Sequence, residues 1–150
     1  MEGIKPILIF AQQNAIFKLV IALVVMDVIF GCLRAIKEKQ FNSSVGINGM
    51  IRKAGMLISL VCMIYLDRIL ELNLIGFIPE GVLQYLPLKR SGIMEFFAVI
   101  YAVYEVLSVL KNMALSGLPV EKIWKVLKNF LQSNTSEIID INDDEEKKEG

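Results

Sequence analysis

The sequence predicts an all-α integral membrane protein with three transmembrane helices, a C-terminal amphipathic interfacial helix and a disordered acidic tail. The 150-residue chain is 55% hydrophobic and its mean hydropathy is +0.55, whereas soluble globular proteins average roughly 45–50% apolar residues even with glycine included. Its basic residues gather between and after three long apolar stretches. The length is that of one domain, and we expect residues 1–132 to be membrane-embedded and residues 133–150 to form the tail.

The three apolar stretches approach the length of about 20 residues that a helix needs to cross a bilayer core. We expect spans at about residues 16–36, 51–71 and 92–112. The second reaches full length because Arg52 and Arg68 can extend their charged ends to the two interfaces. A soluble fold is disfavoured because few polar residues remain to cover three such helices. A cleaved signal peptide is disfavoured because polar residues follow the short apolar stretch 6–10, where a small-x-small site would be required.

The basic residues predict the orientation of the spans. Five lie in the connection between the first two spans: Arg34, Lys37, Lys39, Arg52 and Lys53. Four follow the third span: Lys111, Lys122, Lys125 and Lys128. Basic residues are retained on the cytoplasmic side of a membrane. We therefore expect Arg52, Lys53 and the C-terminal lysines at the cytoplasmic interface, and the N-terminus outside.

The connection between the second and third spans, residues 72–92, is unusually apolar for a loop. Two prolines and several glycines interrupt it, so it is too short and too broken to cross the bilayer. We expect it to lie in the outer interface or to dip partway into the membrane. A fourth, re-entrant segment is the alternative.

An amphipathic helix is expected at residues 119–132, because Gly117-Leu118-Pro119 ends one helix and places proline at the start of the next. The apolar residues recur with helical spacing: Val120, Ile123, Trp124, Leu127, Phe130 and Leu131. Lys122, Lys125 and Lys128 lie on the other side. A basic amphipathic helix with one tryptophan is typical of a helix among the headgroups of an anionic leaflet. The alternative is a helix that packs on protein.

The formal net charge of zero hides two opposite parts. In residues 133–150 seven acids and two lysines leave a net charge of −5, and the first 132 residues carry 14 basic against 9 acidic residues, hence +5. The acidic, polar tail is typical of a disordered segment. The basic residues are spread along an apolar chain, so we expect no nucleic-acid partner.

No set of residues points to catalysis, a cofactor or a metal. The chain has no histidine, and its two cysteines, Cys32 and Cys62, lie inside apolar runs. This composition excludes histidine-based chemistry and disfavours a disulfide scaffold or a CxxC zinc site. We expect a protein that is not an enzyme and has no cofactor.

Several polar or small residues fall at membrane depth, where a charge costs about 2.5–3.5 kcal/mol on insertion scales. One face of the first span carries Asp27, Gly31 and Arg34. One face of the third carries Tyr101, Glu105, Ser108 and Asn112. The second offers Gly55 and Ser59, a pair of small residues suited to close helix packing.

These candidate faces have two interpretations, which composition alone does not separate. In the first, they form a satisfied network within one chain, in which Asp27 pairs with Arg34 or a hydroxyl and Glu105 pairs with Lys111 or stays protonated. In the second, they meet across subunits and line a water-filled assembly.

Three blocks of the sequence, in order, resemble the toxin-secretion/phage-lysis holin family. Residues 27–35 (DVIFGCLRA) are similar to its D-x-x-x-G…A signature. Residues 41–53 (FNSSVGINGMIRK) resemble its connection between the first two spans. Residues 105–119 (EVLSVLKNMALSGLP) resemble its E-x-x-S-x-x-x-N…G-x-P block. Lys111 departs from the pattern, because the family often carries an acid there.

The resemblance implies a holin of the three-span type. Such a protein accumulates in the bacterial cytoplasmic membrane, forms homo-oligomers and opens non-specific holes through which an endolysin, or in some relatives a toxin, leaves the cytoplasm. One alternative is a small ion channel or transporter subunit with Asp27 and Glu105 as an ion site, although no inverted repeat is visible. Another is a membrane adaptor whose C-terminal helix and tail recruit a partner.

Overall fold

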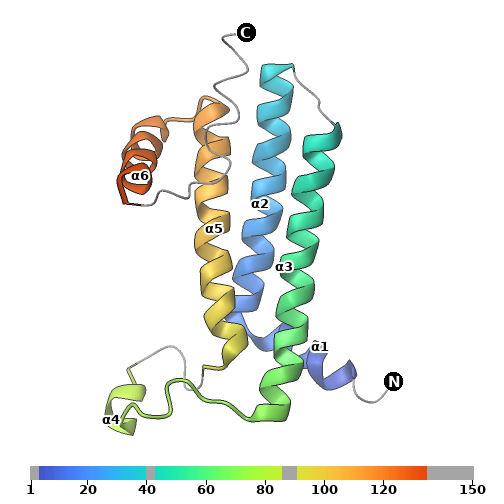
Figure 1. The fold of residues 1–150 in the computed structure, drawn as a ribbon, viewed down its shortest axis with the longest axis vertical. Helices are drawn as coiled ribbons and strands as arrows, with labels where there is room; N and C mark the ends of the chain where they lie inside the picture. The colour runs from blue at the N-terminus through green and yellow to red at the C-terminus, as the bar shows by residue number, and fades with distance from the viewer. Residues whose placement is uncertain (1–3, 40–42, 86–90, 135–150) are drawn as a thin grey trace.

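The computed structural model describes residues 4–39, 43–85 and 91–134, and within these ranges it contains helices and no strands. The helices are α1 (Ile4–Gln13), α2 (Ala15–Glu38), α3 (Ser43–Leu70), α4 (Glu80–Leu83), α5 (Ile93–Leu115) and α6 (Glu121–Asn134). Three of them, α2, α3 and α5, are long and apolar enough to cross a membrane. They stand side by side as a bundle (Figure 1). The predicted fold class is confirmed.

The core of the bundle is a seam of apolar side chains from its three long helices. The most buried of them recur with helical spacing along each helix. They are Phe17, Val20, Leu23 and Val24 of α2, Leu60 and Ile64 of α3, and Met94, Ala98 and Ala102 of α5. The opposite faces of these helices expose large apolar side chains, as expected of helices that face lipid.

The N-terminal helix α1 was not anticipated from the sequence. Pro6 lies in its first turn, where a proline is tolerated because the missing N–H has no partner within the helix. Asn14 separates α1 from α2 and caps α2, since its Oδ1 accepts a hydrogen bond from the Phe17 N–H at 3.0 Å. Helix α1 lies across one end of the bundle, next to the start of α2 (Figure 1).

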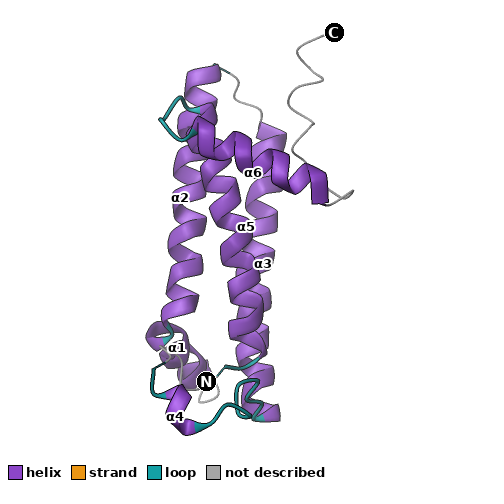
Figure 2. Cartoon of the chain, turned by 90° about the vertical axis from the view of Figure 1, so that its left-hand side faces the viewer, coloured by secondary structure: helices purple, strands orange, loops and turns teal. Residues whose placement is uncertain are grey.

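Two shorter pieces project from the bundle. Helix α6 lies across the end where α2 and α5 finish (Figure 2), and α4 with its flanking loop lies beside the other end. The described part of the second connection does not run back along the bundle (Figure 1). Helix α6 continues to Asn134, and residues 135–150, where most of the disordered tail is predicted, lie outside the described residues.

The turn between α5 and α6 is built on Gly117, whose backbone φ of 88° lies in the left-handed region that favours glycine. Close by, the Lys37 ammonium donates a hydrogen bond to the Leu115 carbonyl at 3.0 Å. A cation at this position satisfies a free carbonyl at the end of a helix. A Cβ atom at position 117 would lie 2.7 Å from the Lys37 Nζ atom, which is the movable end of a flexible side chain, so it is the backbone conformation that requires glycine here.

Candidate functional site

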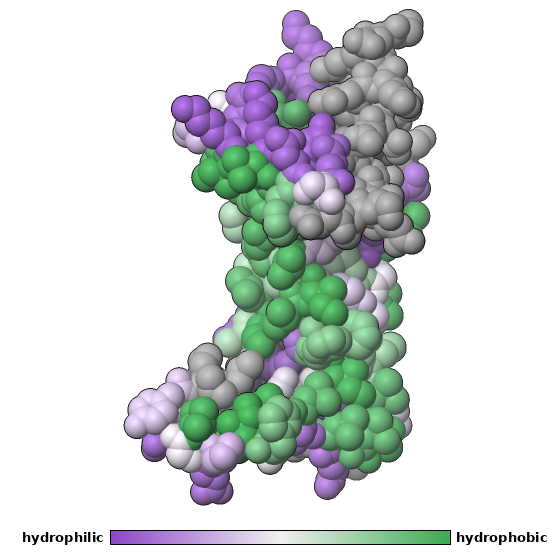
Figure 3. All heavy atoms as spheres, turned by 60° about the vertical axis from the view of Figure 1, so that its left-hand side comes forward, coloured by the Kyte–Doolittle hydropathy of each residue, from purple (hydrophilic) through white to green (hydrophobic). Residues whose placement is uncertain are grey.

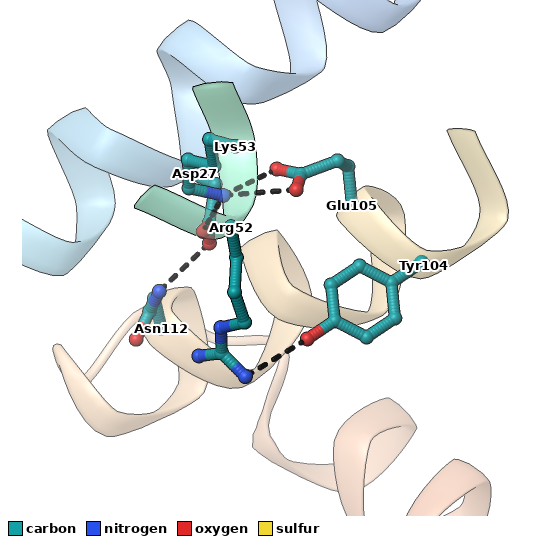
Figure 4. A network of polar contacts seen from close by, with 6 residues as sticks. All are labelled: Asp27, Arg52, Lys53, Tyr104, Glu105 and Asn112. Carbon is teal, nitrogen blue, oxygen red and sulfur yellow. Dashed lines mark hydrogen bonds and ion pairs between the residues drawn. The ribbon is translucent and has the colours of Figure 1, made fainter. Parts of the chain in front are cut away.

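A charged network joins the three long helices inside the bundle (Figure 4). The Lys53 Nζ atom of α3 lies 2.6 Å from Asp27 Oδ2 of α2 and 2.6 Å from Glu105 Oε2 of α5. The side chains are 14%, 7% and 0% exposed for Lys53, Asp27 and Glu105. Asn112 of α5 completes the network, since its amide donates to Asp27 Oδ1 at 2.8 Å. We call these four residues the charged network.

The helical repeat explains why two of these residues meet. Asp27 lies seven residues after Val20 and three after Val24, both of which are buried. Lys53 lies seven residues before Leu60, which is fully buried. Residues separated by seven fall on one face of a helix. Asp27 and Lys53 therefore occupy core positions of α2 and α3.

Glu105 occupies a core position of α5 for the same reason. It lies seven residues after Ala98 and four before Val109, and both of these side chains are buried. Apolar packing sets the rotation of α5, and this rotation points the carboxylate toward Lys53. The charges therefore meet because they replace apolar residues on faces that already form the core.

The network carries two carboxylates and one ammonium group in a low-dielectric interior. Burying an ion is costly, and the mutual attraction of a buried pair repays that cost only when geometry and further hydrogen bonds are good. Both conditions hold here, because Lys53 contacts both acids and Asn112 supplies another donor. No buried side-chain N or O atom of the described residues lacks a hydrogen-bond partner.

The candidate residues of the first and third spans are partly brought together. Gly31 borders the network, since a Cβ atom there would lie 3.6 Å from the Asn112 amide nitrogen, an ordinary contact. Arg34 forms an ion pair at 3.2 Å with Glu38 on its own helix. Ser108 lies half-buried on α5. Asp27, Glu105 and Asn112 thus belong to one network, and Gly31 lies at its edge.

The two small candidate residues of the second span, four residues apart on α3, differ in what they contact. Ser59 contacts α5, because its hydroxyl lies 3.0 Å from the Tyr101 hydroxyl. Gly55 is exposed, and a Cβ atom there would meet nothing within 4 Å. The small pair therefore does not form one packing surface within the chain. Arg52 is exposed and its guanidinium donates to the Tyr104 hydroxyl at 3.4 Å (Figure 4).

The Lys53 side chain points into the bundle. We expected it at the cytoplasmic interface, and in the structure its ammonium group is turned inward between two acids. The reason is its position on α3, which aligns it with Leu60 and Ile64 and not with the exposed residues of that helix. The network resembles the first of the two interpretations, a satisfied set within one chain, but Lys53 is a partner that neither interpretation named. The spacing from Lys53 to Leu60 was the signal that could have identified it.

The lysines of α6 lie on the surface at the end where α6 crosses the bundle. Lys122 and Lys125 are exposed, and Lys128 is half-buried. Lys125 pairs with Glu121 at 2.7 Å. The hydrogen bond from Lys125 lowers the pKa of the exposed Glu121 carboxyl below its usual range. This pair is exposed to solvent and contributes little to stability.

A second polar cluster, which the sequence did not indicate, lies at the other end of the bundle. The Asp67 carboxylate of α3 accepts hydrogen bonds at 2.8 Å from the backbone N–H groups of Ile93 and Met94, the first residues of α5. Glu95 accepts from the Gly92 N–H and from the Asn14 amide, both at 2.8 Å. We call Asn14, Asp67, Gly92 and Glu95 the cap network.

Gly92 is required in the cap network because any Cβ atom there would run into the Asp67 carboxylate. Asp67 and Glu95 accept hydrogen bonds from N–H groups at the start of α5, which have no partner inside the helix. Their negative charges are also stabilised there by the positive end of the helix dipole. The described residues contain no group of three or more acids or cysteines that could hold a metal ion.

Comparison with known proteins gives a consistent result. The model of the bacteriophage holin family matches residues 7–132. The chain is 42% identical to the holin-like protein TcdE of Clostridioides difficile over 113 residues, which cover 75% of this chain and 68% of that protein. It is 28% identical to an uncharacterized 14.9 kDa protein in the nagH 3′ region of Clostridium perfringens over 106 residues, 70% of this chain and 68% of that protein. No solved structure matches.

Proposed function

The chain belongs to the bacteriophage holin family, and we propose from this premise that its copies associate in the bacterial cytoplasmic membrane and open holes that release a cytoplasmic protein. The family match covers most of the chain and confirms the resemblance of the three sequence blocks. Three helices suited to crossing a membrane make the chain a multi-pass membrane protein. The released protein is an endolysin or a toxin.

The observation that carries the mechanism is the charged network. In the closed bundle Lys53 satisfies both Asp27 and Glu105, so a single copy can rest in the membrane with its charges hidden. Charged side chains in a membrane helix persist when they face other helices or water. The same residues that stabilise the closed bundle therefore suit the wall of a hydrated hole.

Helix α3 is the element that we propose to move. Of the three long helices it is the least covered by the rest of the chain, with 11% of its span buried against 28% for α2 and 33% for α5. Lys53 is a polar link from α3 to both of the other long helices. Displacing α3 in a crowded assembly would separate Lys53 from the acids and expose all three charges to water.

The proposed orientation places the N-terminus outside and the C-terminus in the cytoplasm. The support is the distribution of basic residues, which gather at the end of the bundle that carries α6. With this orientation the cap network and α4 lie at the outer face of the membrane.

The test is timed expression in a bacterium together with a cytoplasmic muralytic enzyme. We expect an abrupt loss of membrane potential followed by release of the enzyme and lysis. Asp27→Asn and Glu105→Gln each remove one charge from the network, and we expect each to change the time of lysis and the distribution of oligomers. Glu80→Gln removes the same charge at an exposed position in α4 and serves as the matched control.

Two outcomes would contradict parts of this proposal. Unchanged timing and unchanged oligomers in both network variants would remove the charged network from the mechanism. Passage of ions without any release of the enzyme would contradict the holin function itself and favour a channel.

A further inference from the structure

Two arms project from the same side of the bundle, one at each end. The first arm is α6, and the second is residues 72–85, which include α4 (Figures 1 and 2). Helix α5 runs between them. From this side the molecule is hollowed between the arms, and apolar residues cover the hollow (Figure 3). We call the outward face of α5 together with the two arms the α5 side.

The bundle covers only part of the apolar half of α6. Trp124 is buried, 8% exposed, and Leu127 is half-buried. Ile123, Val126 and Phe130 are 55%, 69% and 64% exposed. At about 100° per residue these three lie between the buried group and Lys122, on the side away from Lys125 and Lys128. The bundle therefore occupies one part of the apolar half and leaves the other part open.

This division bears on both interpretations of the helix that the sequence allowed. The prediction placed Trp124 in one interfacial face with Val120, Ile123, Leu127, Phe130 and Leu131, and packing on protein was the alternative. In the structure Trp124 is buried against the bundle, whereas the side chains of Ile123, Val126 and Phe130 are exposed. A helix with three such sides fits the corner between a protein wall, a lipid leaflet and water.

The second arm exposes the aromatic residues Phe77 and Tyr85, whose exposed fractions are 84% and 82%. Its base is fixed near the start of α5, because the Leu74 N–H donates to the Ser91 carbonyl at 2.7 Å and the Ser91 N–H donates to Asn73 Oδ1. Aromatic side chains are enriched where the hydrocarbon core of a bilayer meets the headgroups. The arm therefore presents such residues at one end of α5.

The spacing of the arms matches a bilayer. Helix α5 has 23 residues, a length of about 35 Å at 1.5 Å per residue, against about 30 Å for a hydrocarbon core. Between the arms α5 exposes Phe96, Val99 and Val103. These residues lie on the side of the helix opposite the buried Ala98 and Glu105.

We propose that the α5 side is a lipid-binding face. Acyl chains fill the hollow between the arms, and anionic headgroups bind beside α6. The charge of α6 supports this occupant, because its three lysines and one glutamate leave a net charge of +2 that attracts an anionic leaflet. A second copy fits less well, since a partner helix as long as α5 would meet both arms before it reached α5.

The experiment places single tryptophans in the full-length protein in vesicles that contain brominated lipids, which quench tryptophan on contact. The chain has one tryptophan, so Trp124→Phe gives a silent background for Phe130→Trp and Val103→Trp. We expect both reporters to be quenched severalfold more than Asn129→Trp, an exposed position on the polar side of α6. We also expect stronger quenching of Phe130→Trp by brominated phosphatidylglycerol than by brominated phosphatidylcholine.

Charge variants test the anionic lipid separately. Replacing Lys122, Lys125 and Lys128 by glutamine should remove the preference of Phe130→Trp for brominated phosphatidylglycerol. Lys18→Gln, which removes an exposed lysine from α2, should leave that preference unchanged. If Trp124→Phe disturbs the fold, the same positions can be tested as cysteines in a Cys32→Ser/Cys62→Ser chain by labelling with a water-soluble maleimide. Positions 103 and 130 should then react much more slowly than position 129.

The proposal is overturned if Val103→Trp is shielded from brominated lipid in the assembled protein and quenched after dilution to single copies, because a second copy would then cover α5. Equal quenching of Phe130→Trp by both brominated lipids would overturn the anionic part. Neither result depends on hole formation, so a chain that lyses cells can still fail this test.

Discussion

The charged network and the cap network both bury carboxylates where helices meet, yet they use them differently. In the cap network Asp67 accepts from two backbone N–H groups and Glu95 accepts from another N–H and a neutral amide. In the charged network Asp27 and Glu105 both depend on the ammonium group of Lys53. The first set is distributed over several neutral donors, whereas the second relies on one ammonium group for both acids, with Asn112 as a further donor to Asp27 alone.

This difference indicates which end of the bundle stays closed and where the helices can separate. Backbone donors at the start of α5 stay in place as long as the helix exists, so the cap network holds α3 and α5 together at that end. A link through one ammonium group is lost entirely when α3 moves. We therefore expect the bundle to open from the charged network while the cap network stays closed.

The largest effect is expected from Lys53→Met, which leaves two buried carboxylates without their counter-ion. Removing one partner of a buried ion pair costs about 3–5 kcal/mol. The free energy of unfolding, measured by circular dichroism in detergent micelles, should fall by that amount.

Two variants control this prediction. Arg52→Met removes the neighbouring exposed cation and should change stability little. The triple variant Asp27→Asn/Lys53→Met/Glu105→Gln should recover much of the loss, because no buried charge then remains. A triple variant as unstable as Lys53→Met would show that packing, and not charge, is responsible.

A smaller loss is expected from Asn112→Leu, which removes one donor to Asp27 and leaves Lys53 in place. A hydrogen bond to a charged group contributes about 1.5–3 kcal/mol. The same unfolding measurement should show a loss in this range, and lysis should begin earlier because the closed bundle is weakened. Stability equal to that of the unmodified protein would place Asn112 outside the network.

Asp67→Ala tests the cap network and should cost about 0.5–2 kcal/mol, as the loss of a helix N-terminal cap does. Gly92→Ala should have a similar effect because its Cβ atom displaces the Asp67 carboxylate. The two networks are distinguished by timing, since we expect Asp67→Ala to lower stability without the shift in lysis time seen with Asp27→Asn. Equal shifts in both variants would remove the distinction drawn between the two networks.

The smallest effect is expected from Tyr101→Phe, which removes the hydroxyl contact with Ser59 between α3 and α5. Hydrogen bonds between membrane helices average about 0.6 kcal/mol in double-mutant cycles. Ser59→Ala and the double variant complete such a cycle. A coupling well above that average would make this contact a third link of α3 alongside the two networks.

Much of the architecture was predictable because its signals are local. Apolar length identified the three spans, and helical spacing identified α6 and the shared face of Glu105 and Asn112. The partner of the two acids was not found, because basic residues near a span end were assigned to the interface. The rotation of α3, set by Leu60 and Ile64, decides that Lys53 points inward.

The cap network and the attachment of Trp124 were harder to predict for a different reason. Asp67 acts on α5 across 26 positions of sequence, and no spacing rule connects an acid at the end of one helix to the start of another. The hydrophobic side chain of Trp124 suits burial against a helix bundle as well as insertion into a lipid leaflet. Only the placement of α6 against the bundle separates the two roles.

The turn at Gly117 connects the arm formed by α6 to the bundle. Its left-handed backbone and the Lys37 ammonium above it fix the angle at which the chain turns out of α5. Because Lys37 belongs to α2, a tilt of that helix would be transmitted to α6 as a change in its pitch against the membrane plane. The angle of α6 at the membrane surface would then depend on the tilt of the spanning helices.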